Sequence, residues 1–450
     1  MDLHSRGSCP GIVPPYLLQH LVASGDADLA ERARRTLVHD SVLRTRPIRP
    51  IRPAATTAGP QRTIHDAHNG TSLPGEVVRS EGEPATDDQA VNEAYDGLGE
   101  TWRLFDEAFG RNSIDGNGLP LLATVHYDRD YENAFWNGAQ MVFGDGDGTI
   151  FLGFTRSIDV IGHELTHGVT ESTADLVYHG QPGALNESVS DVFGALVKQR
   201  TLGQTADQAD WLIGADLLAP GVQGVALRSM KDPGTAYDDP RLGKDPQPAD
   251  MAGYVETTDD NGGVHINSGI PNRAFHVAAT AIGGNAWEAP GQIWYDVLTG
   301  PAIRPDCDFA TFARLTADAA TARFGEGSAE SMAVQEAWQT VGVTGPDDGT
   351  AETQAPAPTA ADELSLRRTG GFGGMVRQRT LRIGELPDDD ASRWRDLLTD
   401  DRLTRLADAP THPDAFCYGV RCDAARLDVT IPEPVLEPDV RDLFERTLTR

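Results

Sequence analysis

The stretch Val160–Val169, VIGHELTHGV, places two histidines four residues apart around a glutamate. On an α-helix, residues at i and i+4 lie on the same face, so the imidazoles of His163 and His167 can meet at one metal ion. Glu164 leans beside that ion and can reach a water bound there. Chance is the competing explanation, because this short pattern arises in about one chain in fifty. The motif alone therefore predicts a zinc site only if further ligands lie nearby.

A third ligand is required, because catalytic zinc uses three protein ligands and keeps one position open. Glu187 follows in GALNESVSDVFG, which has the pattern of a helix start, and Asp191 is four residues further on the same face. A zinc-ligating histidine usually donates its second N–H to a carboxylate, a role that Asp191 can fill towards His163. The simpler explanation of Glu187 is an acid favoured by the dipole at a helix N-terminus.

The residue pattern around the motif changes from strand-like to helical. In residues 118–154, β-branched and aromatic residues alternate between Asn-Gly and Asp-Gly turns, as expected of antiparallel hairpins. From Asp159 onward the apolar spacing predicts helices within 159–173, 184–202, 268–284, 290–300 and 309–325. The sequence therefore predicts an α+β fold with the site in a cleft between a strand-rich and a helical lobe.

These residues resemble the thermolysin family of zinc metallopeptidases, whose pattern is HExxH followed by a glutamate in Asn-Glu-x-x-x-Asp. The likeness runs from Thr63 to Thr344 and includes ENAFWNGAQMVFGDGDG, LRSM and DDNGGVHINSGIPN in the family's order and spacing. It implies the two-lobe fold of that family with zinc in the cleft. The zinc ligands that it implies are His163, His167 and Glu187.

The resemblance also implies the catalytic groups. Glu164 would be the general base that takes a proton from water and passes it to the leaving amine. His265 and Tyr178 match the family's two donors to the oxyanion formed on the peptide carbonyl. Asp260 matches the carboxylate that orients His265. The alternative for DDNGGVHI is a hairpin turn with an incidental histidine.

Substrate contacts follow from the same resemblance. Asn133 and the backbone of Ala134 would pair with an extended peptide as an added strand, while Arg228 would face the carbonyl after the scissile bond. The walls of the pocket for the residue after the cut would be Phe151, Val160, Ile213 and Leu227. Because all four are apolar, cleavage before Leu, Phe or Ile is expected, although each would also be ordinary in a core.

A calcium site of the family is expected to be missing here. The family often carries a double calcium site built from acids, but the matching positions hold Lys198, Leu212 and Ala215. Only Asp159 and Asp210 remain, and a lysine would repel the ion. The sequence thus predicts Zn²⁺ as cofactor and no double calcium site, and leaves other calcium sites open.

Two stretches predict domain boundaries. RPIRPIRP, residues 46–53, favours an extended polyproline path, and residues 345–361 contain no aromatic, Ile, Leu, Val or Met that could form a core. We therefore predict a segment 1–53, a catalytic domain 54–344, a linker 345–361 and a small α+β domain 362–450.

The N-terminal segment CPGIVPPYLLQHL resembles the short propeptide of protealysin-like members of the family. Residues 1–53 carry eight arginines against five acids and are too short to fold alone, and residues 27–44 predict an amphipathic helix. The resemblance implies a propeptide that covers the cleft until it is cut near residues 46–53. A sharper hypothesis is that the Cys9 thiolate takes the open zinc position, the alternative being a free thiol.

The C-terminal domain resembles emfourin, a small proteinaceous inhibitor of protealysin-like enzymes, on LRRTGGFGGMVRQRTL and the order of the predicted elements. The resemblance implies a built-in regulator. Because a flexible linker tethers it, its high effective concentration could make even a weak inhibitor effective. The glycine-rich loop Gly370–Gly374 is the candidate inhibitory element, although a glycine-rich hairpin turn explains it equally well. The alternative is a generic accessory or targeting domain.

Composition limits the remaining classes of function. The chain has 450 residues with 68 acids against 38 Lys and Arg, a net charge of −30, which argues against a nucleic-acid partner. No apolar run approaches the roughly 18 residues of a membrane span, and no signal-peptide core follows the N-terminus. The resemblances, within these limits, imply a zymogen of a zinc-dependent neutral endopeptidase, with proteins or peptides as substrates and its own two ends as intramolecular partners. The alternative is a binding protein whose cleft is permanently blocked. Secretion without a recognisable signal peptide is expected, with a cytoplasmic location as the alternative.

Overall fold

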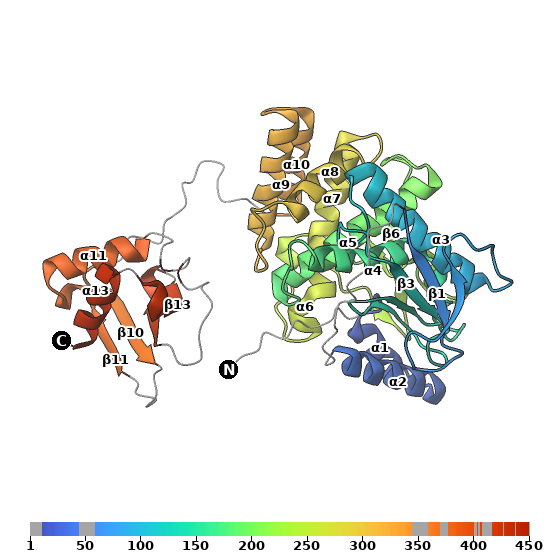
Figure 1. Ribbon diagram of the computed structural model, residues 1–450, viewed down its shortest axis with the longest axis horizontal. Helices are drawn as coiled ribbons and strands as arrows, with labels where there is room; N and C mark the ends of the chain where they lie inside the picture. Colours follow the sequence, from blue (N-terminus) through green and yellow to red (C-terminus); the bar gives the residue numbers. More distant parts are fainter. Residues whose placement is uncertain are drawn as a thin grey trace. The chain divides into compact units, whose positions relative to one another are not determined.

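The computed structural model describes residues 11–44, 59–343, 359–369, 377–399, 403, 406, 416–425, 427–436 and 438–449. The chain forms two compact units, Met1–Gly345 and Pro346–Arg450 (Figure 1), and each has its own hydrophobic core. The predicted boundary stretch 46–53 and residues 345–358 of the predicted linker 345–361 lie outside the described residues. Among the described helices, none is long and apolar enough to cross a membrane.

The strand-rich lobe of the first unit contains one mixed sheet in the order β2-β1-β3-β5-β4. Its strands are β1 (Arg62–Asp66), β2 (Glu76–Ser80), β3 (Leu121–Val125), β4 (Ala134–Trp136) and β5 (Met141–Phe143). β1 pairs with β2, and β4 with β5, in antiparallel fashion. β3 pairs in parallel with both β1 and β5.

The expectation of successive antiparallel hairpins in residues 118–154 is therefore wrong for β3. After β3 the backbone passes through the left-handed region at His126, Asp128 and Asp130, with φ of 52°, 54° and 52°. These residues carry the chain across the sheet instead of turning it back. Only the β4–β5 hairpin follows the expected pattern, and β4 becomes the edge strand.

Helix α3 (Gln89–Arg103) packs on the sheet and was not expected from the sequence. Its N-cap, Asp88, accepts hydrogen bonds from the backbone N–H groups of Ala90 and Val91, which satisfies donors that the first turn leaves free. A π-helical turn, Leu104–Ala108, follows it.

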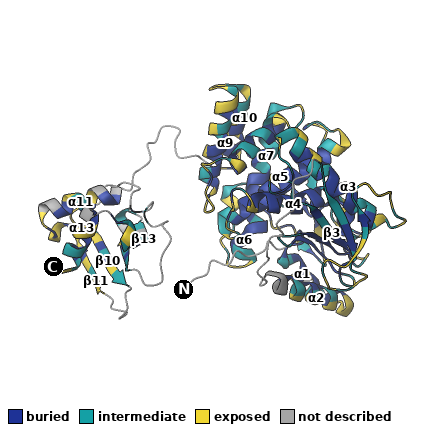
Figure 2. Ribbon diagram, viewed as in Figure 1, coloured by how far each residue is buried: buried dark blue, intermediate teal, exposed yellow. Residues whose placement is uncertain are grey.

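The helical lobe is built around two buried helices, α4 (Ile158–Glu171) and α5 (Gly180–Leu202), which Figure 2 shows mostly in the colour of buried residues. Glycines let them approach closely, since a Cβ on Gly194 would lie 2.4 Å from the Asp159 carbonyl oxygen. Because α5 already begins at Gly180, Glu187 lies in the helix interior, and the expected helix start at that point is wrong. The other helices are α6 (Asp260–Asn267), α7 (Gly269–Ile282), α8 (Ala289–Thr299), α9 (Phe309–Phe324) and α10 (Ala329–Thr340).

Short elements connect these helices. Two-stranded ladders pair β6 (Leu212–Ile213) with β7 (Arg228–Ser229) and β8 (Asp238–Asp239) with β9 (Gly243–Lys244). Single 3-10 turns occur at Phe154–Arg156, Ala215–Leu217 and Met251–Gly253. The α+β fold with a strand-rich and a helical lobe is thus confirmed.

The N-terminal segment forms α1 (Pro15–Ala23) and α2 (Ala27–Arg44), which lie at the end of the first unit opposite α9 and α10 (Figure 1). The predicted helix over residues 27–44 is confirmed, whereas α1 was not expected. Ile12, Leu17, Leu18 and Leu21 are fully or almost fully buried in the same core as the two lobes. The segment therefore gains its stability by packing on the rest of the unit.

The second unit is a four-stranded antiparallel sheet with helices, in the strand order β11-β10-β12-β13. Its elements are β10 (Glu363–Thr369), β11 (Arg377–Arg382), α11 (Asp388–Thr399), β12 (Cys417–Cys422), β13 (Leu427–Pro432) and α13 (Pro438–Thr449), with 3-10 turns at Ile383–Glu385, Asp423–Ala425 and Glu433–Val435. Trp394 of α11 stacks on Phe444 of α13 with ring centroids 4.8 Å apart. The candidate inhibitory loop Gly370–Gly374 lies outside the described residues.

Candidate metal centre

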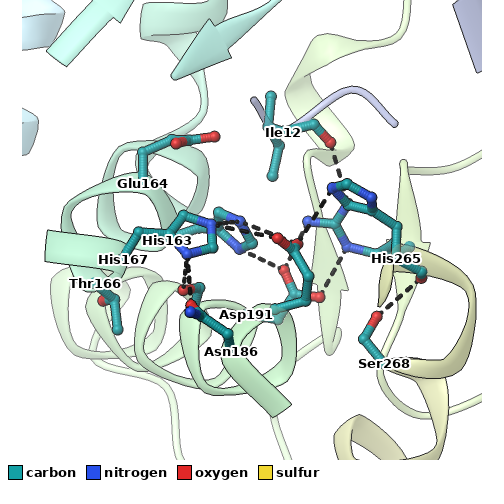
Figure 3. A network of polar contacts seen from close by, with 12 residues as sticks. Ile12, His163, Glu164, Thr166, His167, Asn186, Asp191, His265 and Ser268 are labelled. Carbon is teal, nitrogen blue, oxygen red and sulfur yellow. Dashed lines mark hydrogen bonds and ion pairs between the residues drawn. The ribbon is translucent and has the colours of Figure 1, made fainter. Parts of the chain in front are cut away.

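Two histidines of α4 and one glutamate of α5 converge on a single point (Figure 3). The Nε2 atoms of His163 and His167 are 3.0 Å apart. Glu187 places Oε2 3.5 Å from His163 Nε2 and Oε1 3.5 Å from His167 Nε2, and all three side chains are buried. The sequence-predicted ligand set is thus brought together by the packing of α4 on α5.

The hydrogen bonds of these histidines define which nitrogen faces the centre. His163 Nδ1 lies 2.7 Å from Asp191 Oδ1, and His167 Nδ1 lies 2.8 Å from Asn186 Oδ1. Because each Nδ1 faces an acceptor, it carries the proton, and each Nε2 presents a lone pair to the centre.

Burial lowers the pKa of both His163 and His167 to about 4, so both are neutral near pH 7. Among the described residues, Glu187 Oε2 has no hydrogen-bond partner. Two lone pairs and a carboxylate facing one buried point need a cation between them. Two imidazoles and one carboxylate fit zinc, with one position left open.

Asp191 of α5 connects this centre to a buried arginine. Burial would raise the pKa of Asp191, but the charges of Arg228 and His163 outweigh it and lower the pKa. Its carboxylate accepts from Arg228 Nε at 2.8 Å and Nη2 at 2.7 Å, in addition to His163. Asn272 Nδ2 also donates to it at 2.8 Å. One carboxylate thus orients a candidate metal ligand and a candidate substrate-binding residue.

Glu164 lies beside the histidine pair and is fully buried. Its Oε2 accepts a hydrogen bond of 2.9 Å from the backbone N–H of Trp136 in β4. Burial, together with the charge of Glu187, raises the pKa of Glu164 well above its usual range, while backbone hydrogen bonds from Trp136 and Ile12 oppose this. The raised pKa makes this carboxylate a stronger proton acceptor than an ordinary glutamate.

His265 faces the centre from α6. Its Nδ1 lies 2.6 Å from Asp260 Oδ1, its backbone N–H donates to Asp260 Oδ2 at 2.9 Å, and its Nε2 lies 3.6 Å from Glu187 Oε2. Burial would lower the pKa of His265, but the charges of Asp260 and Glu187 raise it. The Tyr178 hydroxyl donates to Glu187 and lies 3.3 Å from His265 Nε2.

A left-handed turn makes the Asp260–His265 contact possible. Asp260, Asn261, Gly262 and Gly263 all have positive φ, between 51° and 82°. This turn brings the Asp260 side chain back over the first helical residues to reach His265. The stretch DDNGGVHI is therefore a helix entrance and not the hairpin that was its alternative reading.

An extended piece of the N-terminal segment follows the predicted substrate track. The backbone N–H of Ile12 donates to the Ala134 carbonyl at 3.0 Å, and that of Val13 donates to Asn133 Oδ1 at 2.9 Å. Asn133 Nδ2 donates back to the Val13 carbonyl at 3.3 Å, and Arg228 Nη1 donates to the Ile12 carbonyl at 3.2 Å. Figure 3 shows Ile12 between Glu164 and His265.

The four predicted pocket walls are all buried in the core of the first unit: Phe151, Val160, Ile213 and Leu227. Ile213 and Leu227 are adjacent, because the Leu227 N–H donates to the Ile213 carbonyl at 3.0 Å beside Arg228 of β7. The structure thus places part of the predicted wall next to the arginine that holds the Ile12 carbonyl.

Lys198 occupies a position that matches the family's double calcium site, which the sequence predicts to be absent here. Its Nζ lies 3.3 Å from Asp159 Oδ2, 3.0 Å from Asp210 Oδ2 and 3.2 Å from the Leu212 carbonyl oxygen. Burial would lower the pKa of Lys198, but Asp159 and Asp210 raise it. The lysine does more than repel an ion, since its ammonium group lies among these oxygens as a cation would.

Several residues that complete the site were not found from the sequence. Asn186 and Asn272 orient the histidine and aspartate described above, and Asp40 of α2 accepts from Tyr131 at 2.5 Å and from Asn133 at 3.0 Å. Asn186 directly precedes Glu187, which was a usable signal. Nothing in the spacing of Asn272 or Asp40 points to their partners. The hypothesis on Cys9 falls outside the described residues.

The comparisons with known proteins agree with this geometry. Residues 54–171 match the profile of the thermolysin metallopeptidase catalytic domain, residues 174–343 that of its α-helical domain, and residues 366–448 that of emfourin. The extracellular metalloprotease of Pectobacterium carotovorum subsp. carotovorum is 54% identical over 343 residues, 76% of this chain and 98% of the relative. Protease PrtS of Photorhabdus sp. (strain Az29) is 48% identical over 342 residues, 74% of this chain and 92% of the relative. The solved precursor of protealysin, a metalloproteinase from Serratia proteamaculans, is 56% identical with a TM-score of 0.70, covering 75% of this chain and 100% of its own.

Proposed function

Because this chain belongs to the thermolysin family and is a zinc metalloendopeptidase, we propose that it hydrolyses protein and peptide substrates at the centre formed by His163, His167 and Glu187. The observation that carries this assignment is the convergence of two Nε2 lone pairs and a carboxylate on one buried point. Both imidazoles are neutral, as metal ligands must be.

Each neighbouring side chain has a role that its contacts support. Zinc, when bound, supplies the Lewis acidity that activates water and polarises the peptide carbonyl. Glu164, whose pKa is raised by burial, takes a proton from the attacking water and delivers it to the departing amide nitrogen. His265, held by Asp260, and Tyr178 donate hydrogen bonds to the carbonyl oxygen as it becomes negative. Asp191 positions His163 and Arg228.

We infer the path of a bound substrate from Gly11–Val13. We interpret this segment as running in the same N-to-C direction as a substrate peptide. We infer from its hydrogen bonds that Ile12 corresponds to the residue after the scissile bond and Val13 to the next position. An apolar residue at the Ile12 position agrees with the apolar side chains Phe151, Val160, Ile213 and Leu227 as pocket walls. We therefore propose a preference for Leu, Phe or Ile after the cut.

We further propose that residues 1–53 form a propeptide and residues 54–344 the catalytic domain. The segment forms hydrogen bonds with Asn133, Ala134 and Arg228. While it is bound there, a substrate cannot form hydrogen bonds with the same groups. The chain is then made as a zymogen and gains activity when the segment leaves. Zinc is proposed as the cofactor, with Lys198 in place of the double calcium site.

Residues 362–450 are proposed to act as a regulatory domain behind a linker, residues 345–361, because their sequence matches emfourin. The extracellular relatives support the proposal that this protein is secreted. Neither proposal depends on the chemistry of the metal centre.

The test is hydrolysis of a fluorogenic peptide with Leu after the cleaved bond, by the full chain and by residues 1–345, after maturation and with or without a zinc chelator. Glu164→Gln is the matched control, since it should keep stoichiometric zinc but lose hydrolysis. Higher activity of residues 1–345 than of the full chain would support regulation by the second unit. The proposed function would be overturned if neither the full chain nor residues 1–345 bound zinc or showed chelator-sensitive hydrolysis.

A further inference from the structure

Four acids of the strand-rich lobe gather under α2, beside the substrate track. We call Asp128, Asp130, Glu132 and Asp147 the acidic patch. Glu132 directly precedes Asn133, whose side chain holds the backbone of Val13. The patch is therefore adjacent to the position that we assign to the second residue after the scissile bond.

Two arginines of α2 cover the acidic patch. Arg32 Nη2 lies 3.0 Å from Asp147 Oδ2, and Arg35 Nε lies 3.5 Å from Asp128 Oδ2. Arg35 also donates to the carbonyl of Arg129, and His39 Nδ1 lies 3.6 Å from Asp128. The ligand that the patch accepts in this structure is thus a guanidinium group at the end of a flexible side chain.

Glu132 gives an independent sign that the patch is built for a cation. Its side chain is fully buried, yet neither carboxylate oxygen has a hydrogen-bond partner among the described residues. Burial raises the pKa of Glu132 to about 8, the charges of Asp147 and Asp130 add to this, and Arg32 and Arg35 oppose it. A buried carboxylate without a donor is costly unless a cation can approach it.

We propose that the acidic patch is a specificity subsite, which binds an Arg or Lys side chain at the second or third substrate residue after the scissile bond. This inference rests on the proposed function and on departure of α2 with the rest of the propeptide. Once α2 leaves, Asp147 and Asp128 lose the guanidinium groups of Arg32 and Arg35 that pair with them. A substrate strand held by Asn133 brings its own side chains next to these acids. Arginine fits best, because its fork can bond two carboxylates at once.

The test uses the full chain after complete maturation, with active sites titrated by a zinc-directed inhibitor. Fluorogenic peptides share one sequence with Leu after the cleaved bond and carry Arg, Gln or Glu at the second or the third position. We expect kcat/KM for the Arg peptide to exceed that for the Gln peptide on the order of tenfold at one of these positions, as one charge-assisted hydrogen bond would give. Added salt should reduce the ratio.

Variants separate this subsite from general effects. Glu132→Gln and Asp147→Asn should each lower the Arg-to-Gln ratio of kcat/KM, mainly by lowering kcat/KM for the Arg peptide. Glu326→Gln removes an exposed acid of the helical lobe as the matched control and should change neither value.

Equal cleavage of Arg and Gln peptides at both positions would overturn the inference, as would a preference that survives in the double variant Glu132→Gln/Asp147→Asn. Either result leaves the proposed peptidase function intact, because the Gln peptide is still cleaved. Failure to cleave any peptide would overturn both the function and this subsite.

Discussion

Gly11 is the residue on which docking of the N-terminal segment depends most directly. A Cβ added there would lie 2.0 Å from the Ala134 carbonyl oxygen and 2.6 Å from Asn133 Oδ1. Carbon and carbonyl oxygen rarely approach closer than about 3.3 Å, so Gly11→Ala must push the segment away by roughly 1 Å.

A shift of that size breaks the hydrogen bonds of Ile12 to Ala134 at 3.0 Å and of Val13 to Asn133 at 2.9 Å. Each contributes about 1 kcal/mol net, and the buried Ala134 carbonyl left without a donor costs about 1 kcal/mol more. Asn133 Oδ1 still accepts from the backbone N–H of Ala134. The expected loss is about 3 kcal/mol, or roughly a hundredfold in the equilibrium between covered and open cleft.

The assay uses the full chain with Glu164→Gln, which cannot process itself, and measures the Kd of a peptide hydroxamate that binds zinc. The apparent Kd is the intrinsic Kd divided by the fraction of molecules whose cleft is open. Gly11→Ala should therefore tighten binding roughly a hundredfold over the same precursor with Gly11. Gly153→Ala is the control, because its Cβ would meet its nearest atom, the Asp145 carbonyl oxygen, at 3.7 Å. An unchanged Kd for Gly11→Ala would refute the reasoning. It would mean that other contacts of the segment keep the cleft covered.

Three further outcomes follow from the described contacts. Lys198→Met should lower the free energy of unfolding by about 3 kcal/mol, because it leaves two carboxylates without their cation, and chemical denaturation with and without calcium measures this. Hydrogen bonding to Asp145, with a further contribution from Asp88, outweighs burial and raises the pKa of His126 to about 9. Its stabilising contribution is complete below about pH 6.5 and is lost as the pH rises through 9. The free energy of unfolding measured by chemical denaturation should therefore fall over that range by about 1 kcal/mol more than in His126→Gln, a figure reduced for partial exposure. His265→Gln should lower kcat on the order of a hundredfold with little change in KM, and a larger effect on KM than on kcat would argue against an oxyanion role.

Local patterns in the sequence carried most of what could be predicted about the ligands. The spacing of His163 and His167 works through the geometry of one helix, so it needs no knowledge of the rest of the fold. Glu187 lies on another helix, and only the close packing of α4 on α5 brings it to the same point. Family resemblance supplied that link, since spacing alone left a helix-terminal acid as an alternative.

Features that depend on contacts between distant elements were not predicted. After β3 the chain passes through left-handed residues such as His126 and Asp128, and β3 pairs in parallel with its neighbours. No local sequence pattern predicts these φ values. The side chain of Asp260 reaches His265 only because four successive residues turn left-handed. The charge of Lys198 predicts incompatibility with calcium, but its position as the cation between Asp159 and Asp210 depends on contacts between distant parts of the chain.

Asp191 has a consequence for how this peptidase can change over evolution or by design. It holds His163 with one oxygen and Arg228 with both, so the metal centre and the recognition of the substrate carbonyl share one anchor. A substitution that shifts Arg228 to accommodate a different peptide backbone pulls on the carboxylate that orients His163. New specificity is therefore more readily reached through residues outside this anchor, such as the pocket walls, than through Arg228 itself.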